Sequence, residues 1–139
     1  MEERERIVRL WLDCWLQRKD LGIATIFAPD AVYIESWGPI YRGAVQIKHW
    51  FEEWNTRGVV NEWKIEGFFH KDRQTVVTWY FANQMKDGRR EVFDGVSVVE
   101  WTEDGKIALL KEYGCNLDRY DPYEGGDTPQ FREEKAHWF

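Results

Sequence analysis

The feature that most constrains the fold is a run of four strand-like segments in the second half of the chain. These segments are rich in β-branched and aromatic residues, and tight turns separate them. They are Val60–His70, Gln74–Met85, Arg90–Trp101 and Lys106–Tyr113. The Asp87-Gly88 pair is the strongest of the turn signals. Four long strands joined in this way predict an antiparallel meander.

The first half of the chain has helical periodicity instead. Between Glu2 and Lys19, apolar residues recur at spacings of three and four and form one stripe, which includes Ile7, Trp11, Cys14 and Trp15. Asp20 is suited to cap a short second helix, which Pro29-Asp30 should stop. A third helix is predicted from Ala44 to Asn55, with an apolar face formed by Ile47, Trp50, Phe51 and Trp54.

A short hairpin is expected between the second and third helices. Its strands are Ala31–Glu35 and Ile40–Arg42, and Trp37-Gly38-Pro39 forms the turn. Helices followed by a meander predict an α+β fold, in which a curved antiparallel sheet wraps around the N-terminal helices to form a cone. We expect one domain over residues 1–114. Residues 115–139 form an extension, with one helical turn near Arg132–His137, that packs on the domain or on a partner subunit.

The composition narrows the possible partners. The chain of 139 residues has a net charge of −6, which argues against nucleic acid or an anionic membrane as a partner. No apolar run is long enough to span a membrane, and with only two cysteines we expect a cytoplasmic protein. The three histidines are not spaced as metal ligands, and the sequence has no phosphate-binding or nucleophile motif. We therefore expect neither a metal nor a cofactor.

Aromatic residues make up 17% of the chain, and nine of them are tryptophans. Such a content indicates either a core of large residues or a cavity with walls of flat rings.

Three short motifs resemble the nuclear transport factor 2-like superfamily, in its SnoaL-like branch. The first runs from Asp20-Leu21-Gly22-Ile23 to Ile26-Phe27-Ala28-Pro29-Asp30-Ala31, and the second is Tyr41-Arg42-Gly43 followed by Ile47 and Trp50-Phe51. The third runs from Gly95 to Trp101 and continues in Asp104-Gly105-Lys106-Ile107. The resemblance covers roughly residues 5 to 114. It implies a conical fold with a pocket between the sheet and the helices, and frequent homodimers through the sheet. It does not imply one function, because members include isomerases, cyclases, dehydratases, epoxide hydrolases and transport factors.

The resemblance also suggests where chemistry would occur. Glu35 occupies the place of the general-base aspartate of ketosteroid isomerases, and burial in an apolar pocket would raise its pKa. The alternative is a glutamate at the mouth of the cone that meets water. Trp11 aligns with the tyrosine that donates to the oxyanion, although core packing in the apolar stripe of the first helix is the favoured explanation for it. Ser97 stands where those isomerases hold a protonated aspartic acid, which argues against steroid-type isomerisation.

Glu112 is the second candidate acid. Many SnoaL-like proteins carry an acid at the corresponding place on the last strand. Strand alternation groups Glu112 with Leu110, but both faces of this strand are apolar, so its direction stays open. If both glutamates point inward, they could form an acid/base pair.

The remaining expectations concern the lining of the pocket. The strand around Tyr80 carries aromatic residues on both faces, which indicates cover on both. We expect Thr78, Tyr80 and Ala82 to point inward, with Trp79 and Phe81 outward toward a second subunit or the C-terminal tail. The predicted pocket residues are Trp11, Trp15, Tyr33, Trp50, Trp54, Tyr80, Ser97 and Leu110, around a small apolar or aromatic ligand. The alternative function is a protein-interaction or dimerisation module.

Overall fold

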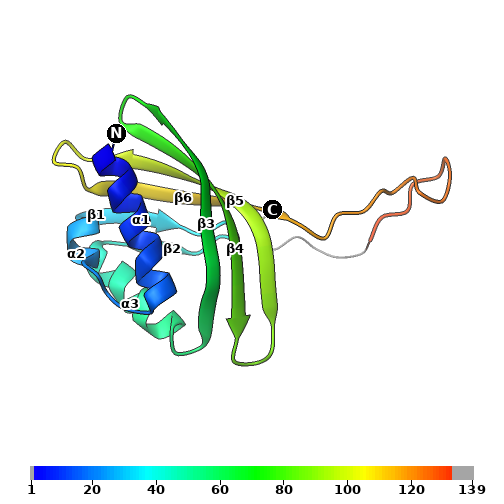
Figure 1. The fold of residues 1–139 in the computed structure, drawn as a ribbon, viewed down its shortest axis with the longest axis horizontal. Helices are drawn as coiled ribbons and strands as arrows, with labels where there is room; N and C mark the ends of the chain where they lie inside the picture. The colour runs from blue at the N-terminus through cyan, green and yellow to red at the C-terminus, as the bar shows by residue number, and fades with distance from the viewer. Residues whose placement is uncertain (1, 133–139) are drawn as a thin grey trace.

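The computed structural model describes residues 2–132 as helices at one side of a single curled sheet (Figure 1). The helices are α1 (Glu2–Gln17), α2 (Ile23–Ile26) and α3 (Ala44–Trp54). The strands are β1 (Phe27–Ile34), β2 (Ile40–Arg42), β3 (Gly58–Lys71), β4 (Gln74–Met85), β5 (Arg90–Trp101) and β6 (Ile107–Asn116). The predicted α+β cone is confirmed.

Helix α1 buries the stripe that its periodicity predicts. Trp11, Cys14 and Trp15 are at most 3% exposed. Glutamates in the first turn face the positive end of the helix dipole and stabilise that end. The helix ends at Gln17, two residues before the predicted end, because Arg18 adopts a positive φ of 56°. This left-handed residue lets the Lys19 N–H donate to the Cys14 carbonyl at 2.9 Å.

The entry to β1 differs from the prediction. The Asp20 carboxylate accepts hydrogen bonds from the N–H groups of Gly22 and Ile23, so it does organise the start of α2. The helix then ends at Ile26, and β1 begins at Phe27 rather than at Ala31. Pro29 lies within the strand because the pairing with β6 is irregular between Phe27 and Val32. Proline has no N–H to donate, and such an irregularity is where a sheet tolerates it.

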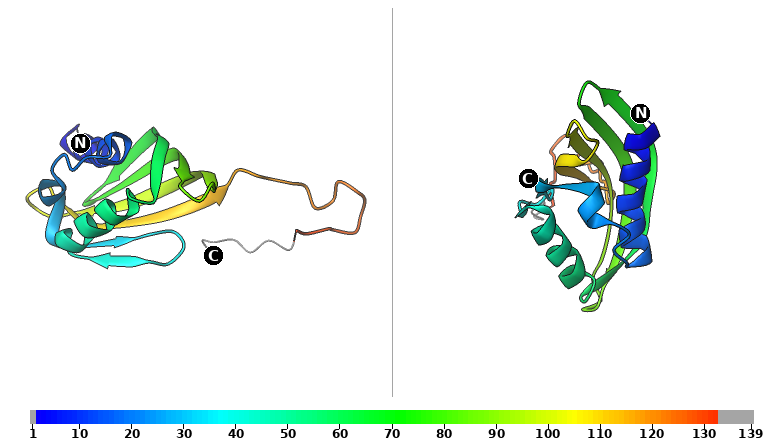
Figure 2. Two further views of the ribbon diagram at one scale, coloured as in Figure 1. Left: turned by 90° about the horizontal axis from the view of Figure 1, so that it is seen from below. Right: turned by 90° about the vertical axis from the view of Figure 1, so that its left-hand side faces the viewer.

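The strand order in the sheet is β2-β1-β6-β5-β4-β3. The last four strands form the predicted antiparallel meander, while β1 pairs in parallel with β6. The last strand therefore lies in the middle of the sheet and joins the N-terminal hairpin to the meander. Helix α1 lies against β3, and α3 packs against β1 and β2 (Figure 2).

The predicted direction of β4 is wrong. Trp79 is 3% exposed and points with Phe81 to the concave side, whereas Thr78 and Tyr80 point to the outer side. Ala82 shares the outer side with Tyr80 and is covered there by its neighbours. The physical reason lies on β5.

Gly95 is the register partner of Trp79 and leaves room for its indole on the concave face. A Cβ atom at Gly95 would lie 2.2 Å from the Trp79 ring. The absence of a side chain on β5 thus determines which face of β4 can bury its tryptophan.

The extension begins later than predicted, because β6 continues to Asn116. Residues 117–132 run away from the domain (Figures 1 and 2), and Arg119 pairs with Asp94 at 3.3 Å near their start. The helical turn expected near Arg132–His137 lies outside the described residues. Of the helices within residues 2–132, none combines the length and the apolar character that crossing a bilayer requires.

Candidate functional site

A cavity of about 1060 Å³ lies between the concave face of the sheet and helices α1 and α3. Ten of the described residues that line it are aromatic. The rings come from both helices and from five of the six strands or the turns beside them: Trp15, Tyr33, Trp37, Tyr41, Trp50, Trp54, Trp63, Trp79, Phe81 and Phe93. A cavity of this size and apolar character suits a small organic ligand.

Trp50 of α3 organises one end of the cavity. Its ring stacks on Tyr41, with centroids 4.3 Å apart and planes 13° from parallel. Tyr33 and Trp15 approach the same indole at 5.0 and 5.1 Å. These contacts fix the ring positions, because each aromatic side chain is held from two or more sides.

Glu112 of β6 points into the cavity, which settles the direction that the sequence left open. The Tyr33 hydroxyl donates a hydrogen bond to Glu112 Oε2 at 2.7 Å, and Tyr33 is 1% exposed. Burial raises the pKa of Glu112 to about 8, the Tyr33 hydrogen bond opposes that rise, and the Glu35 charge adds to it. Glu112 therefore holds a proton near neutral pH.

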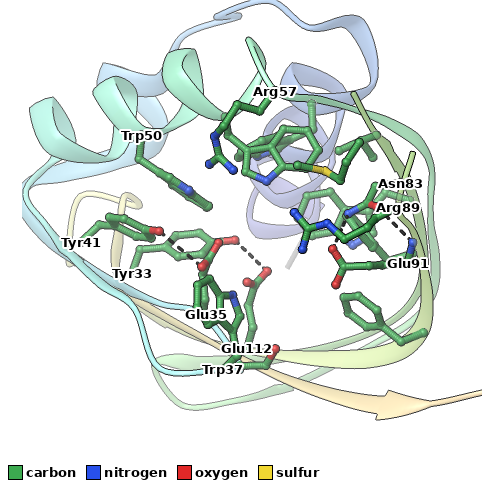
Figure 3. Close-up of a pocket in the computed structure, with 18 of the residues that line it drawn as sticks. Tyr33, Glu35, Trp37, Tyr41, Trp50, Arg57, Asn83, Arg89, Glu91 and Glu112 are labelled. Atoms are coloured by element: carbon green, nitrogen blue, oxygen red, sulfur yellow. Dashed lines mark hydrogen bonds between the residues drawn. The ribbon is translucent and has the colours of Figure 1, made fainter. Parts of the chain in front are cut away.

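Glu35 follows β1 directly and lies beside Glu112 (Figure 3). The Tyr41 hydroxyl donates to Glu35 Oε2 at 3.3 Å. Burial raises the pKa of Glu35 to about 7, although hydrogen bonds from Tyr41 and Trp37 and the Arg57 charge lower it, while the Glu91 charge raises it. The alternative of a glutamate that simply meets water does not fit a carboxyl group held in this way.

Each glutamate thus has its own tyrosine. Tyr33 and Tyr41 are register partners on β1 and β2, and Glu35 shares the strand face of Tyr33. Burial raises the pKa of Tyr33 well above its usual value, and burial with the nearby Glu35 charge raises that of Tyr41. Both phenols therefore stay protonated and act as hydrogen-bond donors.

Trp11 lies beneath the cavity rather than in its wall. It is 1% exposed, and its Nε1 donates to the Tyr33 hydroxyl at 3.4 Å. A phenol that accepts from Trp11 is oriented to donate to Glu112. The core-packing alternative for Trp11 is therefore closer to the structure than direct contact with a ligand.

Three other predicted pocket residues do not line the cavity. Ser97 is 5% exposed, and its hydroxyl accepts a hydrogen bond from Trp79 Nε1 at 2.9 Å. Leu110 is packed in the core next to Tyr33 in the sheet, and Tyr80 points to the outer face. The structure brings together the other predicted residues, which are Trp15, Tyr33, Glu35, Trp50, Trp54 and Glu112.

Several lining residues were missed in the sequence. Tyr41 could have been found, because a hairpin turn at Trp37-Gly38-Pro39 pairs it with Tyr33 on the same face. Trp79 and Phe81 were missed because the predicted direction of β4 was inverted, and Trp63 was missed because no direction was predicted for β3.

Charged residues occupy the other end of the cavity, across from the glutamates (Figure 3). Arg57 makes two hydrogen bonds to Glu53, at 2.7 and 3.0 Å. Arg89 pairs with Asp87 at 2.8 Å. Each of these arginines is therefore compensated by an acid of its own.

Two buried indoles in the cavity wall have unused donors. Trp15 and Trp63 are 3% and 7% exposed, and within residues 2–132 neither Nε1 has a hydrogen-bond partner. A buried N–H group without a partner costs about 1 to 3 kcal/mol. No group of three or more His, Cys, Asp or Glu residues in the described part of the chain is arranged to hold a metal ion.

The model of the SnoaL-like domain family matches residues 8–110. The chain belongs to the SnoaL-like family. Solved structures agree with this assignment at the level of the fold. This SnoaL-like protein superimposes on a hypothetical protein of Catenulispora acidiphila with a ketosteroid isomerase-like fold, which was crystallised with trimethylamine. The TM-score is 0.69 at 18% identity, over 80% of this chain and 85% of that one.

Two further structures show the same fold. An LEH-like epoxide hydrolase of M. tuberculosis gives a TM-score of 0.72 at 20% identity, over 82% of this chain and 84% of that one. A nuclear transport factor 2-like protein of unknown function from Burkholderia pseudomallei gives 0.69 at 16% identity, over 83% and 92%. No curated protein matches the SnoaL-like chain by sequence. At identities this low, the similarity supports the fold alone, and the chemistry must be inferred from the residues of the site.

Proposed function

We propose that this chain binds a small apolar or aromatic molecule in the cavity and transfers a proton on it, in a reaction of the isomerase, cyclase or hydratase type. The observation that carries the proposal is the convergence of Glu35 and Glu112 on one aromatic cavity. Two carboxyl groups whose pKa values are raised by burial to about 7 and about 8 can exchange protons near neutral pH.

The two acids have different surroundings and so different roles. Glu35 has the lower pKa of the pair and acts as the proton acceptor. Glu112 holds its proton to higher pH and donates it to the oxygen atom on which charge develops. Because the two groups influence each other, the pair titrates as a unit, and these roles describe its singly protonated state.

Tyr33 and Trp11 act on Glu112 rather than on the ligand. The chain of hydrogen bonds from Trp11 through Tyr33 to Glu112 holds this carboxyl group in one orientation. Both are therefore positioning residues. Ser97 lies opposite Glu112 in the sheet and does not line the cavity, so Glu112 is the residue that supplies the donor.

Related structures support a small-molecule ligand in general. The Catenulispora protein was crystallised with trimethylamine, and the M. tuberculosis protein is an epoxide hydrolase. The unused indole donors of Trp15 and Trp63 are a further reason to expect a ligand that carries an acceptor atom.

Hydrogen exchange tests the proposed chemistry. The protein would be incubated in D₂O with a panel of cyclic ketones, and loss of the C–H signals beside the carbonyl would be followed by NMR. We expect exchange with the native protein and a loss of at least 100-fold in Glu35→Gln. Glu66→Gln, an exposed change on β3, is the matched control. Equal exchange rates in all three proteins, or none above the buffer rate, would contradict the proposal.

A second candidate function is a homodimer module, with a second copy on the outer face of the sheet. Phe69 and Tyr113 on this face are 63% and 49% exposed, and Val76, Val96 and Val98 lie between them. We also propose a cytoplasmic location for the protein, because its two free cysteines are consistent with a reducing compartment. Sedimentation of the native protein and of Tyr113→Lys tests the dimer, since the lysine should shift the mass to that of a monomer.

A further inference from the structure

The charges around the cavity are not compensated equally at its two ends. At one end, Arg57 and Arg89 have ion-pair partners at 2.7 and 2.8 Å, and Arg90 is exposed at the rim. At the other end, neither Glu35 nor Glu112 has an ion pair with any residue in the described part of the chain. Their partners are hydroxyl and indole groups. Within residues 2–132, no cationic side chain therefore forms an ion pair with either of these two acids.

Aromatic rings surround the same end of the cavity. Trp50 lies between Tyr41 and Tyr33, at centroid distances of 4.3 and 5.0 Å, and Trp37 closes the side of Glu35 (Figure 3). Ring faces attract a cation through their quadrupole, and cages of such rings bind quaternary ammonium groups. The carboxylates and the ring faces therefore both favour a positively charged ligand at this end of the cavity.

We propose that the glutamate end of the cavity is a binding site for a substituted ammonium group, carried by a ligand whose apolar part lies along Trp15, Trp54 and Trp79. The inference rests on the proposed function in one respect, because it places the ligand in the same cavity. It adds the substrate class, an organic cation. An anionic ligand is disfavoured at this end, because the two glutamates would repel it and Arg57 and Arg89 already have acids as partners.

Binding of such a cation is coupled to proton release. The charged groups that act on Glu35 are Glu91 and Arg57, and Glu112 is influenced by Glu35. Near pH 7 the pair of glutamates keeps at least one proton. A bound ammonium ion favours the ionised carboxylate, so a proton leaves the site for the solvent as the cation enters.

The test compares matched probes by isothermal titration calorimetry. Choline and its neutral isostere 3,3-dimethylbutan-1-ol have the same shape and differ in charge. Benzyltrimethylammonium and phenylacetate add an aromatic ring with opposite charges. We expect choline to bind at least tenfold more tightly than its isostere at pH 8, and benzyltrimethylammonium to bind more tightly still. Titrations at pH 7 in two buffers of different ionisation enthalpy should show proton release on binding, up to about one proton for each cation bound.

Variants assign the effect to the site. Glu35→Gln with Glu112→Gln should remove both the preference for the cation and the proton release, while Glu66→Gln keeps them. Trp50→Leu leaves both acids in place and should weaken choline binding by tenfold or more. This variant tests the site if the double glutamine variant does not fold. Binding of the isostere as tight as that of choline, tighter binding of phenylacetate, or no binding of any probe at millimolar concentration would overturn the inference. If no cation preference is found but the protein still exchanges ketone hydrogens in D₂O, the cation site is wrong and the proton-transfer function is supported. If the cation preference is found but no exchange occurs, the cation site is supported and the proton-transfer function is wrong.

Discussion

The hydroxyl group of Tyr33 lies 2.7 Å from Glu112 Oε2, although the two residues are 79 positions apart in the sequence. The same hydroxyl accepts a hydrogen bond from Trp11, so its proton is directed at the carboxyl group. This pair joins the N-terminal hairpin to the last strand at the bottom of the cavity.

Tyr33→Phe should raise the pKa of Glu112 above about 8. The Tyr33 hydrogen bond lowers this pKa, so its removal leaves the effect of burial unopposed. Tyr41→Phe is the matched control, because it removes the corresponding hydrogen bond from Glu35 and should raise the pKa of that group instead. NMR titration of ¹³C-labelled glutamate side chains measures both. A Glu112 pKa that does not change in Tyr33→Phe would contradict the assigned contact.

Stability should fall as the pH rises from about 5 to about 9. Both glutamates have folded-state pKa values above the ordinary 4.5, so the folded protein binds more protons than the unfolded chain over this range. Their contribution is fully present below pH 4.5 and is lost as the pH passes through about 7 and about 8. At about 1.4 kcal/mol per pKa unit, we expect a loss of up to about 6 kcal/mol, measured by urea denaturation at several pH values.

Glu112→Gln should flatten this dependence. An amide of the same shape cannot ionise, so the variant should be more stable than the native protein at pH 9 and similar to it at pH 5. Glu100→Gln on the outer face serves as the control and should leave the curve unchanged. The same slope in Glu112→Gln as in the native protein would show that another group titrates.

Gly95→Ala should destabilise the protein and displace Trp79. The new Cβ atom would lie 2.2 Å from the Trp79 ring, which must then leave its place over the sheet. Overpacking of this kind costs about 1 to 3 kcal/mol. Gly114→Ala is the control, because its Cβ atom would lie 3.4 Å from Phe93, in ordinary contact. Urea denaturation gives the stability, and the near-ultraviolet circular dichroism of the tryptophans reports the displacement. Equal effects of the two changes would argue against this packing.

Thr75→Val should destabilise the far end of the sheet from the cavity. The Thr75 hydroxyl lies 2.8 Å from His70 Nδ1 and accepts from Trp101 Nε1 at 2.9 Å, and the residue is fully buried. Valine has the same shape and leaves both groups without this partner, at a cost of about 1 to 3 kcal/mol. Thr78→Val on the outer face should change the free energy of unfolding by less than about 0.5 kcal/mol. Similar losses in both variants would contradict the buried network.

The sequence was sufficient to predict the helices and the four strands of the meander. It was insufficient to predict which side chains of a strand point into the cavity. Strands β4 and β5 begin and end at the predicted residues, because Asp87-Gly88 and the polar turns around them leave little freedom. The direction of β4 was wrong because Trp79 and Tyr80 are both large and aromatic, so alternation alone gives no preferred face. The space over Gly95, which decides the direction, depends on a register that appears only in the folded sheet.

The candidate site shows the same division. Glu35 and Glu112 could be selected from the sequence, but their convergence depends on the parallel pairing of β1 with β6, which has no local signal. Trp11 was assigned a possible role beside the ligand because it aligns with the isomerase tyrosine, whereas its place in the apolar stripe favoured core packing. Only its 3.4 Å hydrogen bond to Tyr33 shows that it supports the site from below.

The central place of β6 in the sheet has a consequence for synthesis on the ribosome. Strands β1 and β2 leave the exit tunnel early, yet the strand that joins them to the meander is made after all the other described strands. Until then the nascent chain has no complete sheet, and Tyr33 has no carboxyl partner. A chain that stops before residue 107 would therefore present an unpaired edge of β5 to its neighbours, and synthesis of residues 107–116 is the event that completes both the sheet and the acid pair.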